Sequence, residues 1–133
     1  MILKTYVTES QIKRAILAAY GSREDLYLWN APSGVAVSVD GKRPVRYGVP
    51  GQADIMGVWR RGAYYETARF VGMLSSQMVP IHYGQAIAIE VKRPGGQQSE
   101  AQRKWQAVWT RVGGIYVLAR SVDDVAAVLG PPK

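Results

Sequence analysis

Cysteine is absent from the 133 residues of this chain, and histidine occurs once, at His82. The first absence excludes disulfide bridges, thiolate nucleophiles and cysteine-bound zinc. The second excludes motifs that need two histidines, such as HExxH. No apolar run approaches the ~20 residues of a membrane span, so we expect no membrane partner. A GxxxxGK[ST] loop is also missing, so we expect no nucleotide cofactor.

Acidic residues are few relative to basic ones, with 10 Asp and Glu against 17 Lys and Arg and a net charge of +7. Most of the bases are arginines, whose forked guanidinium suits phosphate oxygens. Residues 41–69 concentrate the excess, with six bases against two acids. This balance is typical of a protein that binds nucleic acid, although a merely soluble basic surface explains the charge about equally well.

The length fits a single α/β domain over residues 1–133. Capping signals and hydrophobic patterns predict a mixed β-sheet flanked by helices. Residues 59–84 carry the weakest pattern, and we expect an inserted loop there, with a helix over Glu66–Met73 as the alternative. The expected helices run from Glu9 to Tyr20, from Ser99 to Val112 and from Ser121 to Leu129, and the expected strands are 26–30, 35–39, 45–47, 53–58, 86–92 and 115–119.

The segment Ala86–Lys92 has the clearest strand pattern, because isoleucine and valine alternate with smaller or polar residues. The alternation places Glu90 and Lys92 side by side on one face of the sheet. An acid and a base at this E-x-K spacing are weak evidence of a site. Alone, the motif favours an ordinary ion pair on an edge strand.

Asp54 changes the interpretation of this pair, because it follows a glycine turn at the start of a short apolar strand, where a buried unpaired carboxylate would be costly. It either accepts hydrogen bonds from turn amides or meets Glu90 at one divalent cation. Mg²⁺ binds carboxylate and carbonyl oxygens, so the two acids and the backbone carbonyl of Val91 would supply a site without histidine or cysteine. Mn²⁺ is expected to substitute.

Two of the expected helices each place one polar residue in the first turn, in line with an apolar stripe. Glu9 alone is explained as a partner of the helix dipole, and Gln102 as a capping-box residue with Ser99. Beside Asp54 and the E-x-K pair, they favour one convergent site for phosphodiester hydrolysis. Lys92 would then orient or deprotonate water and stabilise charge, and Gln102 would position Lys92 or that water.

Together these residues resemble the virus-type replication-repair nuclease (VRR-NUC) family, a branch of the PD-(D/E)XK nucleases. The resemblance covers most of the chain, and Ser-x-x-Gln after Glu-x-Lys is its most discriminating part. The chain departs from the superfamily pattern at Ala53, where proline is usual, and in the long interval between Asp54 and Glu90. The matching segments are the helix with Glu9, Asn30 with Gly34, Tyr47–Asp54, Ile89–Lys92, Ser99–Gln102 with Trp105, and Gly113–Gly114.

The resemblance implies a restriction-endonuclease-like core and a Mg²⁺-dependent, structure-selective DNA endonuclease that cuts branched DNA such as four-way junctions. It implies a homodimer, and the cytoplasm of a bacterial host if the chain is phage-encoded. Its metal ligands would be Glu9, Asp54 and Glu90, joined by the Val91 carbonyl, with Lys92 and Gln102 completing the catalytic set. The bases assigned to phosphate contacts are Lys42, Arg43, Arg46, Arg60, Arg61 and Arg93.

Two other functions stay open on the sequence. One is a less selective nuclease or nickase that acts in phage replication or recombination. The other is a DNA-binding or assembly module without catalysis. For the endonuclease that cuts four-way junctions, we expect a homodimer. Symmetric cutting of a junction needs two active sites, whereas one chain of this length holds one.

Overall fold

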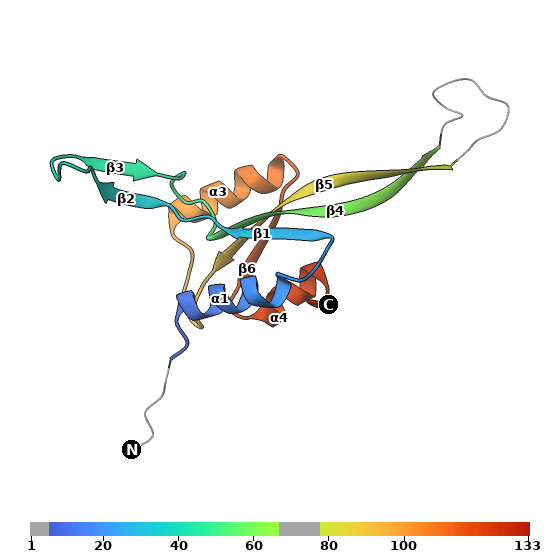
Figure 1. Ribbon diagram of the computed structural model, residues 1–133, viewed down its shortest axis with the longest axis horizontal. Coiled ribbons are helices and arrows are strands. Elements are labelled where there is room, and N and C mark those ends of the chain that lie inside the picture. The colour runs from blue at the N-terminus through green and yellow to red at the C-terminus, as the bar shows by residue number, and fades with distance from the viewer. Residues whose placement is uncertain (1–5, 67–77) are drawn as a thin grey trace, which may run out of the picture.

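The centre of the computed structural model, which describes residues 6–66 and 78–133, is a four-stranded mixed sheet. Its strand order is β1-β4-β5-β6; β4 pairs antiparallel with both β1 and β5, and β6 pairs parallel with β5 (Figure 1). The expected mixed sheet is therefore confirmed. The strands are β1 (Leu26–Asn30), β4 (Ile55–Glu66), β5 (Met78–Val91) and β6 (Ile115–Ala119).

Helices cover both faces of this sheet (Figure 1). α1 (Glu9–Tyr20) and α4 (Val122–Leu129) lie on one face, and α3 (Glu100–Arg111), which connects β5 to β6, lies on the other. Alternation along β5 sends Ile87 and Ile89 to the α1/α4 face, where both are fully buried in the hydrophobic core. The core thus occupies one side of the sheet. No helix in the described part of the chain is long and apolar enough to cross a membrane.

The helices begin where their caps predict. The Thr8 hydroxyl accepts a hydrogen bond from the Gln11 amide, and the Gln11 side chain accepts one from the Thr8 amide. Ser99 and Gln102 form the same reciprocal box at α3, and Ser121 caps α4. These bonds satisfy backbone amides that have no partner within the helix.

Residues 59–84 depart most from the expected structure. β4 continues to Glu66 and β5 begins at Met78, and the two strands pair in register from Ile55 opposite Ile89 out to Glu66 opposite Met78. The described parts of the expected loop are therefore strands of one long hairpin. The rest of the alternative helix, residues 67–73, lies outside the described residues. The hairpin extends beyond the hydrophobic core. Its outer residues therefore do not need to alternate between hydrophobic and polar, which is the pattern that predicts a strand.

Two β-arms leave the body of the domain in different directions (Figure 1). One is the outer half of the β4–β5 hairpin. The other, the ribbon, pairs β2 (Gly34–Val37) with β3 (Pro44–Tyr47) as a separate two-stranded sheet. The expected hairpin around Asp40-Gly41 is confirmed. Most of its side chains are exposed, because the ribbon extends away from the sheet and the helices (Figure 1).

Candidate active site

The start of β4 and the end of β5 bring two carboxylates together. Asp54 immediately precedes β4, and the pairing of Ile55 with Ile89 sets it opposite Glu90. Its Oδ2 atom accepts a hydrogen bond of 2.8 Å from the backbone amide of Val91, so the carboxylate is held against β5. The amide is that of a neighbouring strand rather than of a turn. Glu90 is only 1% exposed, so one member of this acid pair is fully buried.

The two oxygens of Glu90 have different surroundings. Oε1 accepts a hydrogen bond of 2.7 Å from Gln102 Nε2 and lies 3.4 Å from Lys92 Nζ. Oε2 is buried and has no hydrogen-bond partner among the described residues. A buried carboxylate oxygen without a partner is unfavourable, so this position favours either a proton or a cation.

Electrostatics at the acid pair favour protonation of Glu90 in the metal-free protein. Burial is the main cause and the neighbouring charge of Asp54 the second, and together they raise the pKa of Glu90 to about 8 in spite of Lys92. A cation at the same place would relieve the repulsion between the two acids and displace the proton.

Gln102 acts both in the cap and in the acid pair. Its Oε1 atom accepts a hydrogen bond of 2.8 Å from the Ser99 amide, and its Nε2 atom donates to Glu90. The capping and positioning roles, which are alternatives on the sequence, therefore occur together. The bond goes to Glu90 rather than to Lys92. Because the cap fixes the start of α3, it also fixes the donor that orients the buried carboxylate.

Tyr116 is a neighbour of the acid pair that the sequence reasoning did not select. It lies on β6 opposite Ala88, and its hydroxyl accepts a hydrogen bond of 2.9 Å from Gln98. Burial and the nearby charge of Glu90 raise its pKa to about 12. Its position could have been predicted from the sequence, because the alternation of residues 115–119 places Tyr116 on the face of the sheet that carries Glu90.

Glu9 does not join the acid pair. It is exposed in the first turn of α1, and its Oε1 atom is 3.5 Å from the backbone amide of Arg93. Within residues 6–66 and 78–133, no group of three or more Asp, Glu or His side chains is arranged to hold a metal ion. The expected cluster of three carboxylates is therefore not formed. The reason is that α1 packs on the opposite face of the sheet from Glu90 and reaches only the end of β5.

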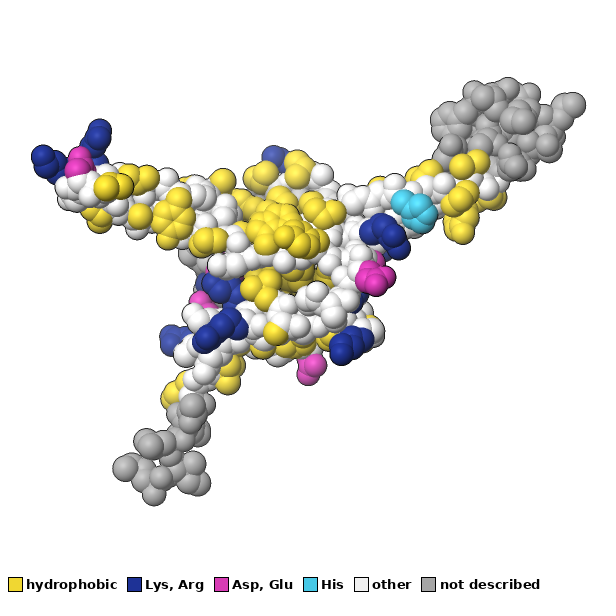
Figure 2. All heavy atoms as spheres, in the orientation of Figure 1, with side chains coloured by type: hydrophobic (Ala, Val, Ile, Leu, Met, Phe, Trp, Pro, Cys, Tyr) yellow, Lys and Arg dark blue, Asp and Glu magenta, His cyan; other side chains and the backbone are white. Residues whose placement is uncertain are grey.

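The six expected phosphate-binding bases do not share one surface. Lys42 and Arg43 lie at the tip of the ribbon, far from β4 (Figures 1 and 2). Arg60 and Arg61 are consecutive residues of β4, so their side chains point to opposite faces. Arg61 stacks 4.3 Å from the centre of the Trp59 ring and donates to Gln85, whereas Arg60 is exposed. Arg46 lies in β3, and Arg93 follows the end of β5.

Gly51 allows the segment before Asp54 to approach α3. Its φ is +80°, and a Cβ atom there would lie 2.2 Å from the backbone oxygen of Ala101. We expect Gly51→Ala to lower the free energy of unfolding in urea by about 2–4 kcal/mol, from left-handed strain and displaced backbone. Gly95→Ala is the matched control, because Gly95 has a φ of +81° and open space around it. It should show only the strain, about 1–2 kcal/mol. Equal losses would contradict the close approach.

Comparison of the chain with protein-family models, with curated proteins and with solved structures gives no significant match. Function is therefore inferred from the acid pair, its neighbours and the surface around them.

Proposed function

We propose that this chain is a Mg²⁺-dependent endonuclease of the PD-(D/E)XK type, similar to the VRR-NUC family, and that it cuts branched DNA. The observation that carries the proposal is the acid pair, in which the buried Glu90 has one oxygen without a partner and lies beside both Asp54 and Lys92. The topology supports it: the acids come from adjacent antiparallel strands of a mixed sheet with helices on both faces.

The donors fit a hard divalent cation. Asp54, Glu90 through Oε2 and the backbone carbonyl of Val91 would hold it, and all three are oxygen ligands of the kind that Mg²⁺ prefers. A bound Mg²⁺ would polarise the scissile phosphate and stabilise the charge that develops there. The acid pair is compatible with one metal ion, because Glu9 lies outside it.

The remaining side chains have distinct roles around this centre. Gln102 holds Oε1 of Glu90, which leaves Oε2 for the cation. Lys92 places its ammonium at the acid pair, where it orients the attacking water and stabilises negative charge on the phosphate. Asp54 is fixed by the Val91 amide, so the donors are oriented before DNA binds.

A direct test compares Mg²⁺ with EDTA on duplex, flap, fork and four-way junction DNA of matched length, under single-turnover conditions. We expect Mg²⁺-dependent cleavage that is fastest on the branched substrates. Asp54→Asn should abolish cleavage and weaken Mn²⁺ binding in calorimetry while leaving junction binding largely intact. Glu100→Gln, which changes an exposed acid of α3, is the control and should cut normally.

Other outcomes of this assay would contradict parts of the proposal. Equal rates on duplex and branched DNA would indicate a less selective nuclease. DNA binding without cleavage in Mg²⁺ or Mn²⁺ would indicate a binding or assembly module. Full metal affinity in Asp54→Asn would exclude this residue as a ligand.

The proposal includes a homodimer. Each chain contributes the single pair of Asp54 and Glu90 to the proposed site, and symmetric cutting of a junction needs two such sites related by a two-fold axis. Sedimentation with and without a junction measures the assembly. A strictly monomeric protein that still cuts both opposing strands within one complex lifetime would exclude the dimer.

A further inference from the structure

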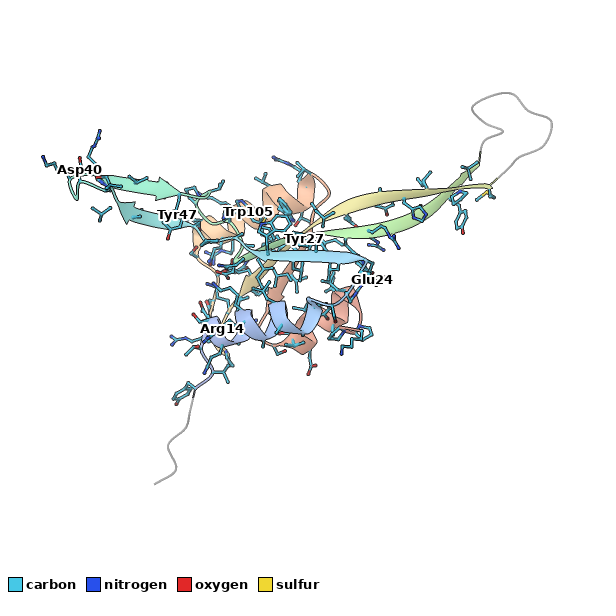
Figure 3. All side chains as sticks on the ribbon, in the orientation of Figure 1. Arg14, Glu24, Tyr27, Asp40, Tyr47 and Trp105 are labelled. Atoms are coloured by element: carbon cyan, nitrogen blue, oxygen red, sulfur yellow. The ribbon has the colours of Figure 1, made fainter. Side chains whose placement is uncertain are left out.

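Aromatic and apolar side chains are exposed on the same side of the sheet as the acid pair. Figure 2 shows hydrophobic side chains gathered over β1 and α3, and Figure 3 labels Tyr27 of β1 and Trp105 of α3. Tyr27 is 70% exposed and Trp29 is 41% exposed, although the rings are large. We call this surface the aromatic face; its residues are Tyr27 and Trp29 of β1, Val58 of β4, and Trp105, Val108 and Val112, of α3 or just beyond its end.

Strand register places the two exposed rings in successive rows next to the acid pair. Trp29 lies opposite Met56, which is two residues from Asp54, and Tyr27 lies opposite Val58, two residues further on. Residues two apart on a strand share a face and are separated by about 7 Å. The rings therefore occupy the next two rows of the sheet beyond the row of Asp54 and Glu90, on β1 and on the same face.

α3 brings its own apolar stripe to the same surface. Ala101, in the first turn, abuts Gly51, which lies just before β4. Helical spacing puts Trp105, Val108 and Val112 in line with Ala101. Trp105 stacks on Trp109, with its ring centre 6.2 Å from that of Tyr116 on β6. At the end of the helix, Val112 lines a hollow with Gly84 and Ala86 of β5. The aromatic face thus combines side chains from different elements, chiefly β1 and α3.

This surface is hollowed and is not needed for the core, which lies on the opposite side of the sheet. One hollow of about 370 Å³ lies between the segment 21–26, which precedes and begins β1, and the residues Tyr27, Val58 and Arg60. Another of about 340 Å³ is lined by Val112 and its neighbours. The two meet at Gly84, where a Cβ atom would lie 2.8 Å from Val58 Cγ1. The rings of Tyr27 and Trp29 lie 5.7 Å apart and tilted, so their faces remain accessible.

Charge around the aromatic face suits phosphate groups. The exposed Arg60 lines the first hollow, and the exposed Arg111 lies on α3 next to the stripe. Two acids, Glu24 and Asp25, also line that hollow, but Asp25 is held in an ion pair of 2.7 Å with Arg23. The two exposed arginines and the net charge of +7 therefore favour a polyanionic ligand with flat apolar groups over an uncharged apolar partner.

We propose that the aromatic face stacks the unpaired bases of a DNA strand whose phosphodiester lies at the acid pair. Every base has a π-face, so stacking on Tyr27 and Trp29 would be independent of sequence. Bases in a duplex are already stacked on one another, whereas those beside a flap, fork or open junction are available. The inference rests on the proposed function and names the feature that the site selects: a single-stranded segment next to the branch.

The test uses the metal-free full chain in EDTA and two labelled probes of equal length, an oligo-dT and an abasic strand with the same phosphates. We expect the wild-type protein to bind oligo-dT much more tightly than the abasic strand. Tyr27→Ala and Trp29→Ala should each weaken oligo-dT binding by roughly 5- to 100-fold, the scale of one lost stacking contact, without changing abasic binding. Tyr64→Ala is the matched control, since Tyr64 is also 70% exposed but lies on the outer β4–β5 arm. It should change affinity less than twofold.

Tyr27→Phe and Trp29→Phe keep a flat ring and should retain most of the affinity, which separates stacking from misfolding. Equal binding of both probes by the wild-type protein, or unchanged oligo-dT affinity in the alanine variants, would overturn the inference. So would alanine variants that sediment as a smaller species while binding oligo-dT normally, because a second copy would then cover the face. Failure of the proposed nuclease activity would instead appear as missing cleavage with ring-dependent oligo-dT binding intact.

Discussion

Replacing Lys92 with alanine should slow single-turnover cleavage of branched DNA by about 10²–10⁴-fold, the scale of lost acid–base and electrostatic help. The Lys92 ammonium lies 3.4 Å from Glu90 Oε1, and its side chain is only 13% exposed. It is therefore held at the acid pair and not in solvent, at the place where the proposed cleavage would develop charge on the phosphate. The rate constant should be measured at saturating Mg²⁺, so that it reports the chemical step.

Lys92 also affects metal binding through Glu90. Its positive charge opposes the rise in the pKa of Glu90, so Lys92→Ala should raise that pKa further and weaken Mg²⁺ binding near pH 7. Near pH 9 metal affinity should recover while cleavage stays slow. Lys104→Ala, which removes an exposed partner of Glu100, is the control and should cut at the parental rate. A parental rate for Lys92→Ala at saturating metal would refute its catalytic role.

Glu90→Gln should make the metal-free protein more stable at alkaline pH, by up to about 4–5 kcal/mol above pH 8. The pKa of Glu90 is raised from 4.5 to about 8 in the folded chain, and each pKa unit corresponds to 1.36 kcal/mol. Below about pH 4.5 the carboxyl is neutral in both the folded and the unfolded chain. As pH rises towards 8, the unfolded chain ionises freely while the folded chain must keep the proton or bury a charge, so stability is lost.

Urea unfolding in EDTA between about pH 5 and pH 9 measures this effect. The wild-type protein should lose stability with rising pH, whereas Glu90→Gln should lose much less. Glu100→Gln should follow the wild type, because it removes an exposed acid. Mg²⁺ should restore the wild-type protein at high pH, since the cation takes the place of the proton, but should not stabilise Glu90→Gln to the same extent. Parallel profiles for wild type and Glu90→Gln would contradict the buried, proton-binding carboxylate.

Local signals in the sequence were sufficient for most of the fold around the site. The Ser99–Gln102 box predicted the start of α3, and alternation along Ala86–Lys92 predicted the face of Glu90 and Lys92. The same local reasoning could not place Glu9. Its helix and its turn were predicted correctly, but which face of the sheet α1 covers depends on long-range packing of Ile12 and Ile16 against the core.

The outer arm and the aromatic face escaped prediction for different reasons. The outer part of the β4–β5 hairpin extends away from the helices (Figure 1), so its sequence shows no alternation of hydrophobic residues towards the core. Tyr27 and Trp29, in contrast, could have been found. They alternate with Leu26 and Leu28 in a strand that was predicted with correct bounds, and rings on the non-core face of a strand indicate either a partner or a ligand.

The ribbon of β2 and β3 can change in length without disturbing the acid pair. The Gln52 side chain closes its base, accepting from the Val49 amide and donating to the Ala31 carbonyl, two residues before Asp54. Loop length costs little free energy once the ends are fixed. Residues can therefore be inserted or deleted at the Asp40-Gly41 tip without moving the acid pair. Related chains can therefore differ in the length of the ribbon and the position of its basic tip while the acid pair stays in place.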